Sequence, residues 1–414
     1  MGSGFLEELA ARRRFGMKPG LETMRGICAA LGNPERRVRA IHVAGTNGKG
    51  AVCAIIDAAL RGAGLKCGRY TSPHLVRINE RFLLDGAPLS DSALEAAAER
   101  VSSVAPEGLT FFEALTAVAF LVYSEAGCDW TVLETGLGGR LDATNVCESS
   151  LCVITRVGLD HCDWLGGTVE EIAAEKAGIA KPGVPVVLGA NVESVRRVVA
   201  ARAEAIGAPF VYAPDVADES EIPRGFPLAG RFNRENAVTA IAALKTLARS
   251  FPSLPAIPAS AFGRVEWPGR FQRIRNFIID GAHNPPAAEA LAASLAETGE
   301  GPFILVAGFC ADKDAAAVLR ILAPHVSRGI AVKTVNPRSL GADETARLMS
   351  EAGIDARAAS SLREALALCG SGKTVVCGSL FLAGEALVEL GAYGAEVRFD
   401  PSERLAASGP DALD

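Results

Sequence analysis

The amino-acid sequence predicts an α/β protein with mainly parallel sheets in two domains. Short apolar runs that end in glycine turns alternate with longer Ala-rich segments, a pattern typical of parallel strands covered by helices. The alternation pauses at a turn-rich stretch, residues 266–270, and then restarts. A chain of 414 residues also exceeds the usual size of a single domain. We therefore expect domains at 1–265 and 271–414, joined by a hinge at 266–270.

In the first domain, four apolar runs are predicted to be buried strands, at residues 39–45, 129–136, 151–158 and 184–190. A helix is predicted directly after the first of them, over residues 50–64. A second helix is predicted over 168–180, because Thr168 and Glu171 have capping-box spacing and the next residues, "KPG", would stop it.

The second, smaller domain repeats the alternation in the manner of a doubly wound fold. Strands are predicted at 277–283, 303–309, 329–335 and 374–381, and helices at 285–297 and 342–353 with one more after the last strand. The polar tail, residues 400–414, is expected to fray.

Composition and charge narrow the functional class. A net charge of -6 argues against a dedicated nucleic-acid binder, which usually presents a basic face. The chain has neither an apolar signal region at its N-terminus nor an unbroken apolar run of membrane-spanning length. Ten cysteines occur without C-x-x-C spacing, so we expect reduced thiols, mostly small core residues, in a cytoplasmic protein.

A glycine-rich turn leads from the first predicted strand into the first predicted helix, and it resembles a phosphate-binding loop. It consists of Gly45, Thr46, Asn47, Gly48 and Lys49. Backbone N–H groups at such a helix start can hold a phosphate, and the lysine adds a positive charge for the outer phosphates.

The loop departs from a full P-loop pattern at two places. Val43 stands where that pattern has glycine, and after Lys49 the chain has Gly50 and Ala51 instead of a serine or threonine. An ordinary glycine-rich turn between a strand and a helix is the alternative interpretation.

Polar residues also follow two other predicted strands. Glu134 ends one strand, and Asp160 and His161 lie just beyond another. Ligands of α/β sheets bind beyond the carboxyl ends of the strands, so Glu134 is placed where a carboxylate could bind magnesium. A helix-capping or surface role for Glu134, and a structural role for His161, are the alternatives.

Lys176 lies on the predicted helix 168–180 among apolar neighbours, including Ala173, Ala177 and Ile179. Apolar surroundings favour the neutral amine of a lysine. A solvated helical lysine is the alternative.

Seven ordered motifs resemble the folylpolyglutamate synthase/dihydrofolate synthase family of the Mur ligase superfamily. They are "VAGTNGKG", "YTSPHL", "ETGLGGRLDATN", "GLDH", "EKAGI", "WPGR" and "DGAHNP", and the resemblance runs from about Lys18 to Gly378. It implies an N-terminal P-loop ATPase domain, a smaller C-terminal Rossmann-like domain and an active site between them. It also implies an ATP-dependent ligase that activates a carboxylate as an acyl phosphate and joins it to the amino group of L-glutamate.

The resemblance implies roles for residues of the first domain. The stretch from Gly45 to Gly50 would bind ATP, with Gly48 and Lys49 at the β- and γ-phosphates. Ser72 and Glu134 would contact a first magnesium ion. His161 would hold a second one together with Glu134 and with Lys176 as a carbamate, whose oxygens suit this ion.

It also implies roles for residues near and beyond the hinge. Asn236 and Arg270 would contact the nucleotide. Asp280 and His283 would approach the γ-phosphate and the substrates. Lys313 would help to bind an anionic substrate, and a solvated loop lysine is the alternative interpretation.

The sequence departs from the family pattern at Ala51, where relatives have serine or threonine, and at Phe232 and Asn233, where a His-Gln pair is common. We expect the first change to affect phosphate or metal binding and the second to affect adenine or hinge contacts.

The leading functional hypothesis is an ATP- and magnesium-dependent ligase of folate metabolism, acting on dihydropteroate, on folates or on both. A related ligase with another carboxylate and amino acid is one alternative, and a nucleotide-binding regulatory protein without turnover is another. We expect a monomer without nucleic-acid or membrane partners.

Overall fold

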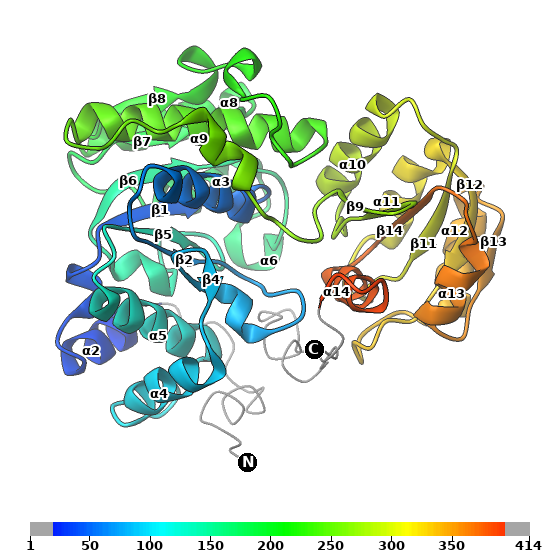
Figure 1. The fold of residues 1–414 in the computed structure, drawn as a ribbon, viewed down its shortest axis with the longest axis horizontal. Helices are drawn as coiled ribbons and strands as arrows, with labels where there is room; N and C mark the ends of the chain where they lie inside the picture. The colour runs from blue at the N-terminus through cyan, green and yellow to red at the C-terminus, as the bar shows by residue number, and fades with distance from the viewer. Residues whose placement is uncertain (1–19, 394–414) are drawn as a thin grey trace.

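The computed structural model describes residues 20–393, which form two β-sheets with helices on both faces of each (Figure 1). We call the first sheet with helices α2 to α9 the N-terminal unit, and the second sheet with helices α10 to α14 the C-terminal unit. The predicted α/β class with mainly parallel sheets is confirmed. The tail that was expected to fray, residues 400–414, lies outside the described residues.

The first sheet has eight strands in the order β4-β3-β2-β5-β1-β6-β7-β8. The six strands from β2 to β8 in this order run parallel, while β3 and β4 extend one edge in antiparallel pairing that the sequence patterns did not predict. The strands are β1 (Ala40–Ala44), β2 (Cys67–Tyr70), β3 (Phe82–Leu84), β4 (Ala87–Pro88), β5 (Trp130–Glu134), β6 (Ser149–Ile154), β7 (Val186–Leu188) and β8 (Phe210–Tyr212).

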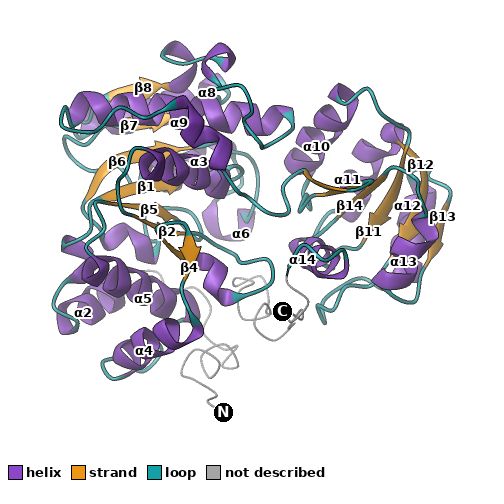
Figure 2. Cartoon of the chain, viewed as in Figure 1, coloured by secondary structure: helices purple, strands orange, loops and turns teal. Residues whose placement is uncertain are grey.

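Helices cover both faces of this sheet, which is why its central strands β1 and β5 are buried along their whole length (Figure 2). Ile41 and Val43 pack into one core with α3 and α9, whereas Ala40 and Ala44 join two cores on the opposite face with α2, α4, α5, α7 and α8. The helices are α2 (Glu22–Ala30), α3 (Lys49–Gly62), α4 (Asp91–Ser102), α5 (Phe111–Ala126), α6 (Cys162–Leu165), α7 (Val169–Ala177), α8 (Glu193–Ala205) and α9 (Arg231–Ser250).

The second sheet has six strands in the order β13-β12-β11-β14-β10-β9, and all but β9 run parallel. The strands are β9 (Gln272–Ile274), β10 (Phe277–Ile279), β11 (Phe303–Ala307), β12 (Val326–Ala331), β13 (Ala356–Ala358) and β14 (Thr374–Cys377). The helices are α10 (Pro285–Glu297), α11 (Ala315–Leu322), α12 (Ala342–Glu351), α13 (Leu362–Cys369) and α14 (Leu380–Glu389).

All four strands predicted in this unit end earlier than expected. Those predicted over 277–283 and 303–309 end at Ile279 and Ala307. The strand predicted over 329–335 begins earlier, at Val326, and ends at Ala331. The strand predicted over 374–381 ends at Cys377, because Gly378 turns with a φ of 110° and Ser379 then caps α14. The Ser379 side chain accepts a hydrogen bond from the amide of Leu382, which commits the following residues to a helix.

The two units touch at several places besides the connecting residues 266–270. Leu75 and Val76, which follow β2, pack into the core of the C-terminal unit beneath α14. Arg234 of α9 forms a 2.6 Å ion pair with Glu297 of α10. The domain limits predicted at 265 and 271 remain a proposal.

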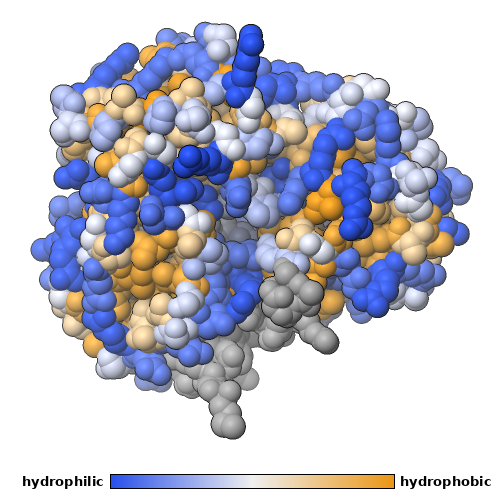
Figure 3. Space-filling model, in the orientation of Figure 1, coloured by the Kyte–Doolittle hydropathy of each residue, from blue (hydrophilic) through white to orange (hydrophobic). Residues whose placement is uncertain are grey.

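The remaining sequence expectations concern cysteines and membranes. All ten cysteines are free, and eight of them are buried, in agreement with small core residues. Within residues 20–393 no helix combines the length and the apolar character needed to cross a membrane. On the face drawn in Figure 3, hydrophilic residues interrupt the apolar patches of both units.

Candidate active site

The glycine-rich loop between β1 and α3 is tied to the loop that follows β6, the neighbouring strand. The amides of Thr46 and Asn47 donate to the carbonyl oxygen of Arg156 at 2.8 and 3.2 Å, and the Thr155 hydroxyl donates to the carbonyl of Asn47 at 2.8 Å. These bonds occupy two of the amides of the predicted phosphate loop. The amides left for a phosphate are therefore those at the start of α3, which have no partner within the helix.

Glycine is required at two positions of this loop because other side chains approach its backbone. A Cβ atom on Gly48 would lie 2.2 Å from Oδ1 of Asn236, and Gly48 also has a φ of 92°. A Cβ atom on Gly50 would lie 2.1 Å from the ring of Trp267, a residue of the connecting stretch. Asn236, predicted as a nucleotide contact, thus lies against the loop itself, and sequence reasoning missed Trp267.

The Lys49 side chain folds over its own loop. Its Nζ donates to the carbonyl oxygens of Gly45 at 3.1 Å and Thr46 at 3.3 Å. The positive charge of Lys49 also acts on two buried groups that come from other elements, Glu134 and Lys176. Lys49 is therefore placed to compensate negative charge at the carboxyl ends of β1 and β5.

Glu134 is a buried carboxylate at the end of β5, with 4% of its surface exposed. Its Oε2 accepts a 3.0 Å hydrogen bond from the amide of Ser72. Burial raises the pKa of Glu134, while Lys49, the Ser72 amide and Arg270 oppose this rise. The structure therefore brings Ser72 and Glu134 together as predicted for a metal site, although here Ser72 contacts Glu134 through its backbone.

Lys176 lies near the end of α7, whose N-terminal capping box of Thr168 and Glu171 is confirmed. Only 3% of the lysine is exposed, so the solvated alternative is wrong. Burial first, and then the charge of Lys49, lower the pKa of Lys176 to about 7. A large fraction of neutral amine is therefore present near neutral pH, and this is the form that reacts with carbon dioxide.

Asp142, which sequence reasoning did not single out, holds the glycine-rich loop after Glu134. Its Oδ2 accepts hydrogen bonds from the amides of Gly136 and Leu137 at 2.8 and 3.0 Å, and its Oδ1 accepts the amide of Thr144 at 3.0 Å. The motif "LDATN" contained Asp142, but the spacing gave no signal that both carboxylate oxygens face backbone amides.

Asp160 and His161 lie in the loop after β6, where His161 precedes α6 with a φ of 52°. Nε2 of His161 lies 3.8 Å from Oδ1 of Asp160. Burial raises the pKa of Asp160, but His161, His283, Lys313 and other basic groups outweigh burial and lower it overall. Asp160 is thus a carboxylate among basic side chains that come from both units.

The residues of this edge fit a divalent cation that prefers oxygen ligands. Glu134 offers a buried carboxylate, Ser72 a nearby hydroxyl, and Lys176 an amine poised to become a carbamate. Across the described part of the chain, no three His, Cys, Asp or Glu side chains by themselves form a metal-binding cluster. The predicted two-magnesium arrangement with His161 therefore needs the carbamate and substrate oxygens, and it stays a prediction.

The loop after β10 supplies the second part of the candidate site. Asp280 accepts the amides of Phe271 at 2.7 Å and Ala282 at 2.8 Å, one on each carboxylate oxygen. Nδ1 of His283 lies 2.7 Å from the carbonyl oxygen of Gly281. Because that carbonyl can only accept, a neutral His283 carries its proton on Nδ1 and presents a lone pair on Nε2.

Arg270 and Lys313 complete the set of predicted residues. Arg270 is partly buried, so it is not a surface linker charge. Burial lowers the pKa of Arg270, whereas Asp280 and Glu134 oppose this change, so Arg270 is close enough to interact with a carboxylate of each unit. Lys313 forms a 3.1 Å ion pair with Asp312 and is half-buried, so it is not simply a solvated loop lysine.

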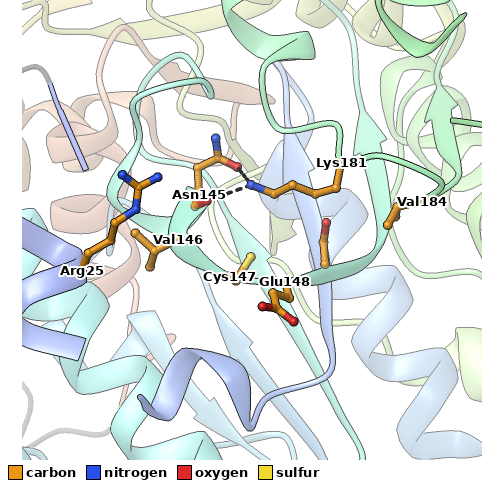
Figure 4. Close-up of a pocket in the computed structure, with 8 residues that line it drawn as sticks. Arg25, Asn145, Val146, Cys147, Glu148, Lys181 and Val184 are labelled. Carbon is orange, nitrogen blue, oxygen red and sulfur yellow. Dashed lines mark hydrogen bonds between the residues drawn. The ribbon is translucent and has the colours of Figure 1, made fainter. Parts of the chain in front are cut away.

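An open hollow of about 380 Å³ lies elsewhere, at the start of β6 (Figure 4). Lys181 points across it and donates to Asn145 at 2.9 and 2.7 Å. No predicted site residue lines this hollow, so the candidate site is defined by its side chains and not by this cavity. Its lining residues are Arg25, Asn145, Val146, Cys147, Glu148, Ser149, Lys181 and Val184.

Comparison with known proteins identifies the family to which this chain belongs. Residues 263–379 match the family described as "Mur ligase, glutamate ligase domain". The dihydrofolate synthase/folylpolyglutamate synthase of Bacillus subtilis (strain 168) is 37% identical over 316 residues, covering 69% of this chain and 74% of that protein. The chain belongs to the folylpolyglutamate synthase/dihydrofolate synthase family.

Solved structures of this family agree with the whole described fold. The folylpolyglutamate synthase of Mycobacterium tuberculosis complexed with ADP has 31% identity and a TM-score of 0.84, covering 93% of this chain and 97% of that one. The bifunctional enzyme of Yersinia pestis complexed with AMPPNP and a manganese ion has 31% identity and a TM-score of 0.81, with the same coverage of both chains. The predicted membership of this family is thus confirmed.

Proposed function

We propose that this protein is an ATP-dependent ligase that adds L-glutamate to the carboxylate of a pteridine acid, either dihydropteroate or a reduced folate. The observation that carries the proposal is the position of Lys49, whose charge acts both on the buried Glu134 at the end of β5 and on the buried Lys176 of α7. A lysine at a phosphate loop, a buried carboxylate and a lysine with a pKa of about 7 together form a site for a nucleotide and a divalent cation.

The proposed reaction has two steps. A carboxylate oxygen of the pteridine acid attacks the γ-phosphorus of ATP, ADP leaves, and an acyl phosphate forms. The amino group of glutamate then attacks the acyl carbon and loses a proton, and phosphate leaves with the oxygen that came from the carboxylate. Lys49 and the free amides at the start of α3 would stabilise the charge that moves onto the phosphate oxygens.

We assign the metal to Ser72, Glu134, His161 and carbamylated Lys176. When bound, magnesium would neutralise phosphate charge and align the reacting oxygens. Glu134 fits this role because its carboxylate is buried and its Oε2 lies against the amide of Ser72, from which it accepts a hydrogen bond. Asn236, which contacts the loop at Gly48, would bind the nucleotide together with Arg270.

The C-terminal unit would orient the substrates. Asp280 uses both oxygens to hold the backbone around Phe271 and Ala282, so it would act by fixing this loop. His283 presents Nε2 as an acceptor, which suits a hydrogen bond from the attacking amino group. We further propose a cytoplasmic monomer with small-molecule substrates and no nucleic-acid or membrane partner.

The test is purified protein with Mg-ATP, L-glutamate and either dihydropteroate or a reduced folate, following ADP and the amide product. We expect ADP release that requires both glutamate and the pteridine acid, with one amide formed per ADP. Absence of glutamate-dependent ADP release with every pteridine acid would contradict the proposal. Amide formation with a different acid or amino acid would instead support the related-ligase alternative.

A further inference from the structure

Helix α10 is the part of the C-terminal unit that contacts the N-terminal unit at both of its ends. Towards its end, Glu297 accepts a 2.6 Å hydrogen bond from Arg234, and Ser294 Oγ accepts a 3.2 Å bond from the amide of Arg231. At its start, Nδ2 of Asn284 donates to Oδ2 of Asp160 over 3.2 Å. Only the contact at the start lies beside the candidate site.

The orientation of the Asn284 amide is determined by its role as the N-cap of α10. Its Oδ1 accepts a 3.0 Å hydrogen bond from the amide of Ala287. Since the carbonyl oxygen is engaged in this way, the NH₂ group must face Asp160. The side chain is 6% exposed, so water competes little for the bond.

The two carboxylate oxygens of Asp160 accept hydrogen bonds from different units. Oδ1 accepts the amide of its neighbour His161 at 3.1 Å, which leaves Oδ2 for Asn284. The Asp160 carboxylate is also close enough to interact with Lys49 of the N-terminal unit and with His283 and Lys313 of the C-terminal unit. The carboxylate therefore lies among the positive or hydrogen-bonding groups that the reaction would use.

We propose that Asp160 is a positioning residue, which holds Asn284 and thereby sets where the adjacent His283 lies relative to Lys49. This inference rests on the proposed function, because it assigns His283 a task in that reaction. Asp160 need not contact nucleotide or substrate to act in this way. Its effect passes through one hydrogen bond to the first turn of α10.

The first test removes the hydrogen bond between Asn284 and Asp160 and then rebuilds it with donor and acceptor exchanged. Asn284→Asp keeps an N-cap of equal quality but sets a carboxylate against Asp160. We expect kcat to fall about tenfold, while the KM for ATP stays within about twofold, because the lost bond is one to a charged group and involves no residue of the phosphate loop itself. Asp160→Asn combined with Asn284→Asp restores an amide–carboxylate pair in the reverse sense, and kcat should return to within about threefold of wild type.

Ser361→Asp is the matched control. Ser361 caps α13, so this change also places a capping carboxylate at the start of a helix of the C-terminal unit, but away from α10. Its kcat should equal that of the wild type. If the double variant is no better than Asn284→Asp, or if Ser361→Asp is equally impaired, the positioning role is wrong. Thermal melting of each variant identifies losses that come from unfolding alone.

A second readout does not depend on catalysis. Small-angle scattering of the full chain with a non-hydrolysable ATP analogue should give a larger radius of gyration for Asn284→Asp than for the wild type, and the double variant should reverse the change. Identical profiles for all three proteins would overturn the inference. A wild-type protein without glutamate-dependent ADP release would contradict the proposed function, and the scattering comparison would still decide the contact.

Discussion

The loops of the N-terminal unit and the loop after β10 hold their polar residues in opposite ways. In the N-terminal unit, backbone bonds and Asp142 fix the loops, while Glu134 and Lys176 are buried with few hydrogen-bond partners among residues 20–393. In the C-terminal unit, Asp280 and His283 are themselves engaged by the backbone of their own loop.

This difference indicates that the two units have different functions. Buried ionisable groups are costly to keep charged without a partner, and their environment suits a ligand that completes them. Carboxylates and imidazoles already bound to backbone groups are better suited to fixing geometry. We therefore assign binding of phosphate and metal to the N-terminal unit and orientation of the substrates to the C-terminal unit.

The largest expected effect is that of Lys176→Ala. Loss of a group that completes the metal site should lower glutamate-dependent ADP release about 100-fold. Because the missing group would be a carbamate, acetate or formate at high concentration should restore part of the activity. Initial rates with and without these carboxylates provide the measurement.

Lys245→Ala is the control for this prediction, because Lys245 is a half-exposed lysine of α9 that pairs with Glu221. It should be as active as the wild type, with no response to acetate. A fully active Lys176→Ala protein would show that the buried lysine does not serve the metal.

The next prediction compares the stability of variants of Asp142 and Asp280, the two carboxylates that hold loops. Asp142→Asn should lower the free energy of unfolding by about 3 kcal/mol, because the new NH₂ group faces backbone N–H donors. Asp280→Asn should cost about 2 kcal/mol, since fewer amides face its carboxylate. Urea denaturation of both variants measures these changes.

Asp314→Asn offers a matched control, because Asp314 caps α11 and asparagine caps helices equally well. Its unfolding free energy should stay within about 0.5 kcal/mol of the wild type. Equal stability of Asp142→Asn and the wild type would contradict the role assigned to this carboxylate.

A third effect concerns pH. Below pH 7, Lys176 is protonated in both the folded and the unfolded chain, so the cost of burying its charge is fully present. Between its folded pKa of about 7 and its unfolded value of 10.5, the folded protein has released the proton while the unfolded chain still binds it. The wild type should therefore gain stability over Lys176→Met as pH rises, on the order of 1 kcal/mol per pH unit.

Urea denaturation in buffers free of carbon dioxide and metal, at several values between pH 6.5 and 9.5, would measure this gain. A Lys245→Met protein should show a profile parallel to that of the wild type. Parallel profiles for Lys176→Met as well would mean that the lysine is not held in a neutral form.

The smallest effect is expected for Ala51→Ser, which adds a hydroxyl near the lysine, as P-loops have. Ser72 and Glu134 already offer oxygen atoms near the loop, so ATP affinity should rise no more than about threefold. Titration with ATP and magnesium measures it, with Ala63→Ser at the other end of α3 as control. A tenfold or larger gain would show that the loop lacks its main metal contact.

Local patterns predicted much of this structure. The alternation of apolar and helical segments led to both sheets, and the helix predicted over 285–297 has the bounds of α10. Periodicity could not show that β3, β4 and β9 pair in antiparallel fashion, since pairing depends on distant partners. Likewise, strand ends pointed to Glu134 and His161, but not to Asp142 or Trp267.

Those two were missed because their roles arise from backbone groups and neighbours that are remote in sequence. Trp267 packs over Gly50, more than two hundred positions earlier in the chain. The low pKa of Lys176 was indicated by its apolar neighbours, whereas the contribution of Lys49 depends on how the strands are ordered.

The central claim is that the protein activates the carboxylate of the pteridine acid as an acyl phosphate before glutamate attacks it. A pteridine acid carrying ¹⁸O in its reacting carboxylate tests it most directly, with ATP, magnesium and L-glutamate present. The account predicts one ¹⁸O atom in each phosphate released, because that oxygen bridges carbon and phosphorus before the amine attacks. Phosphate without the label, formed in step with the amide, would contradict it.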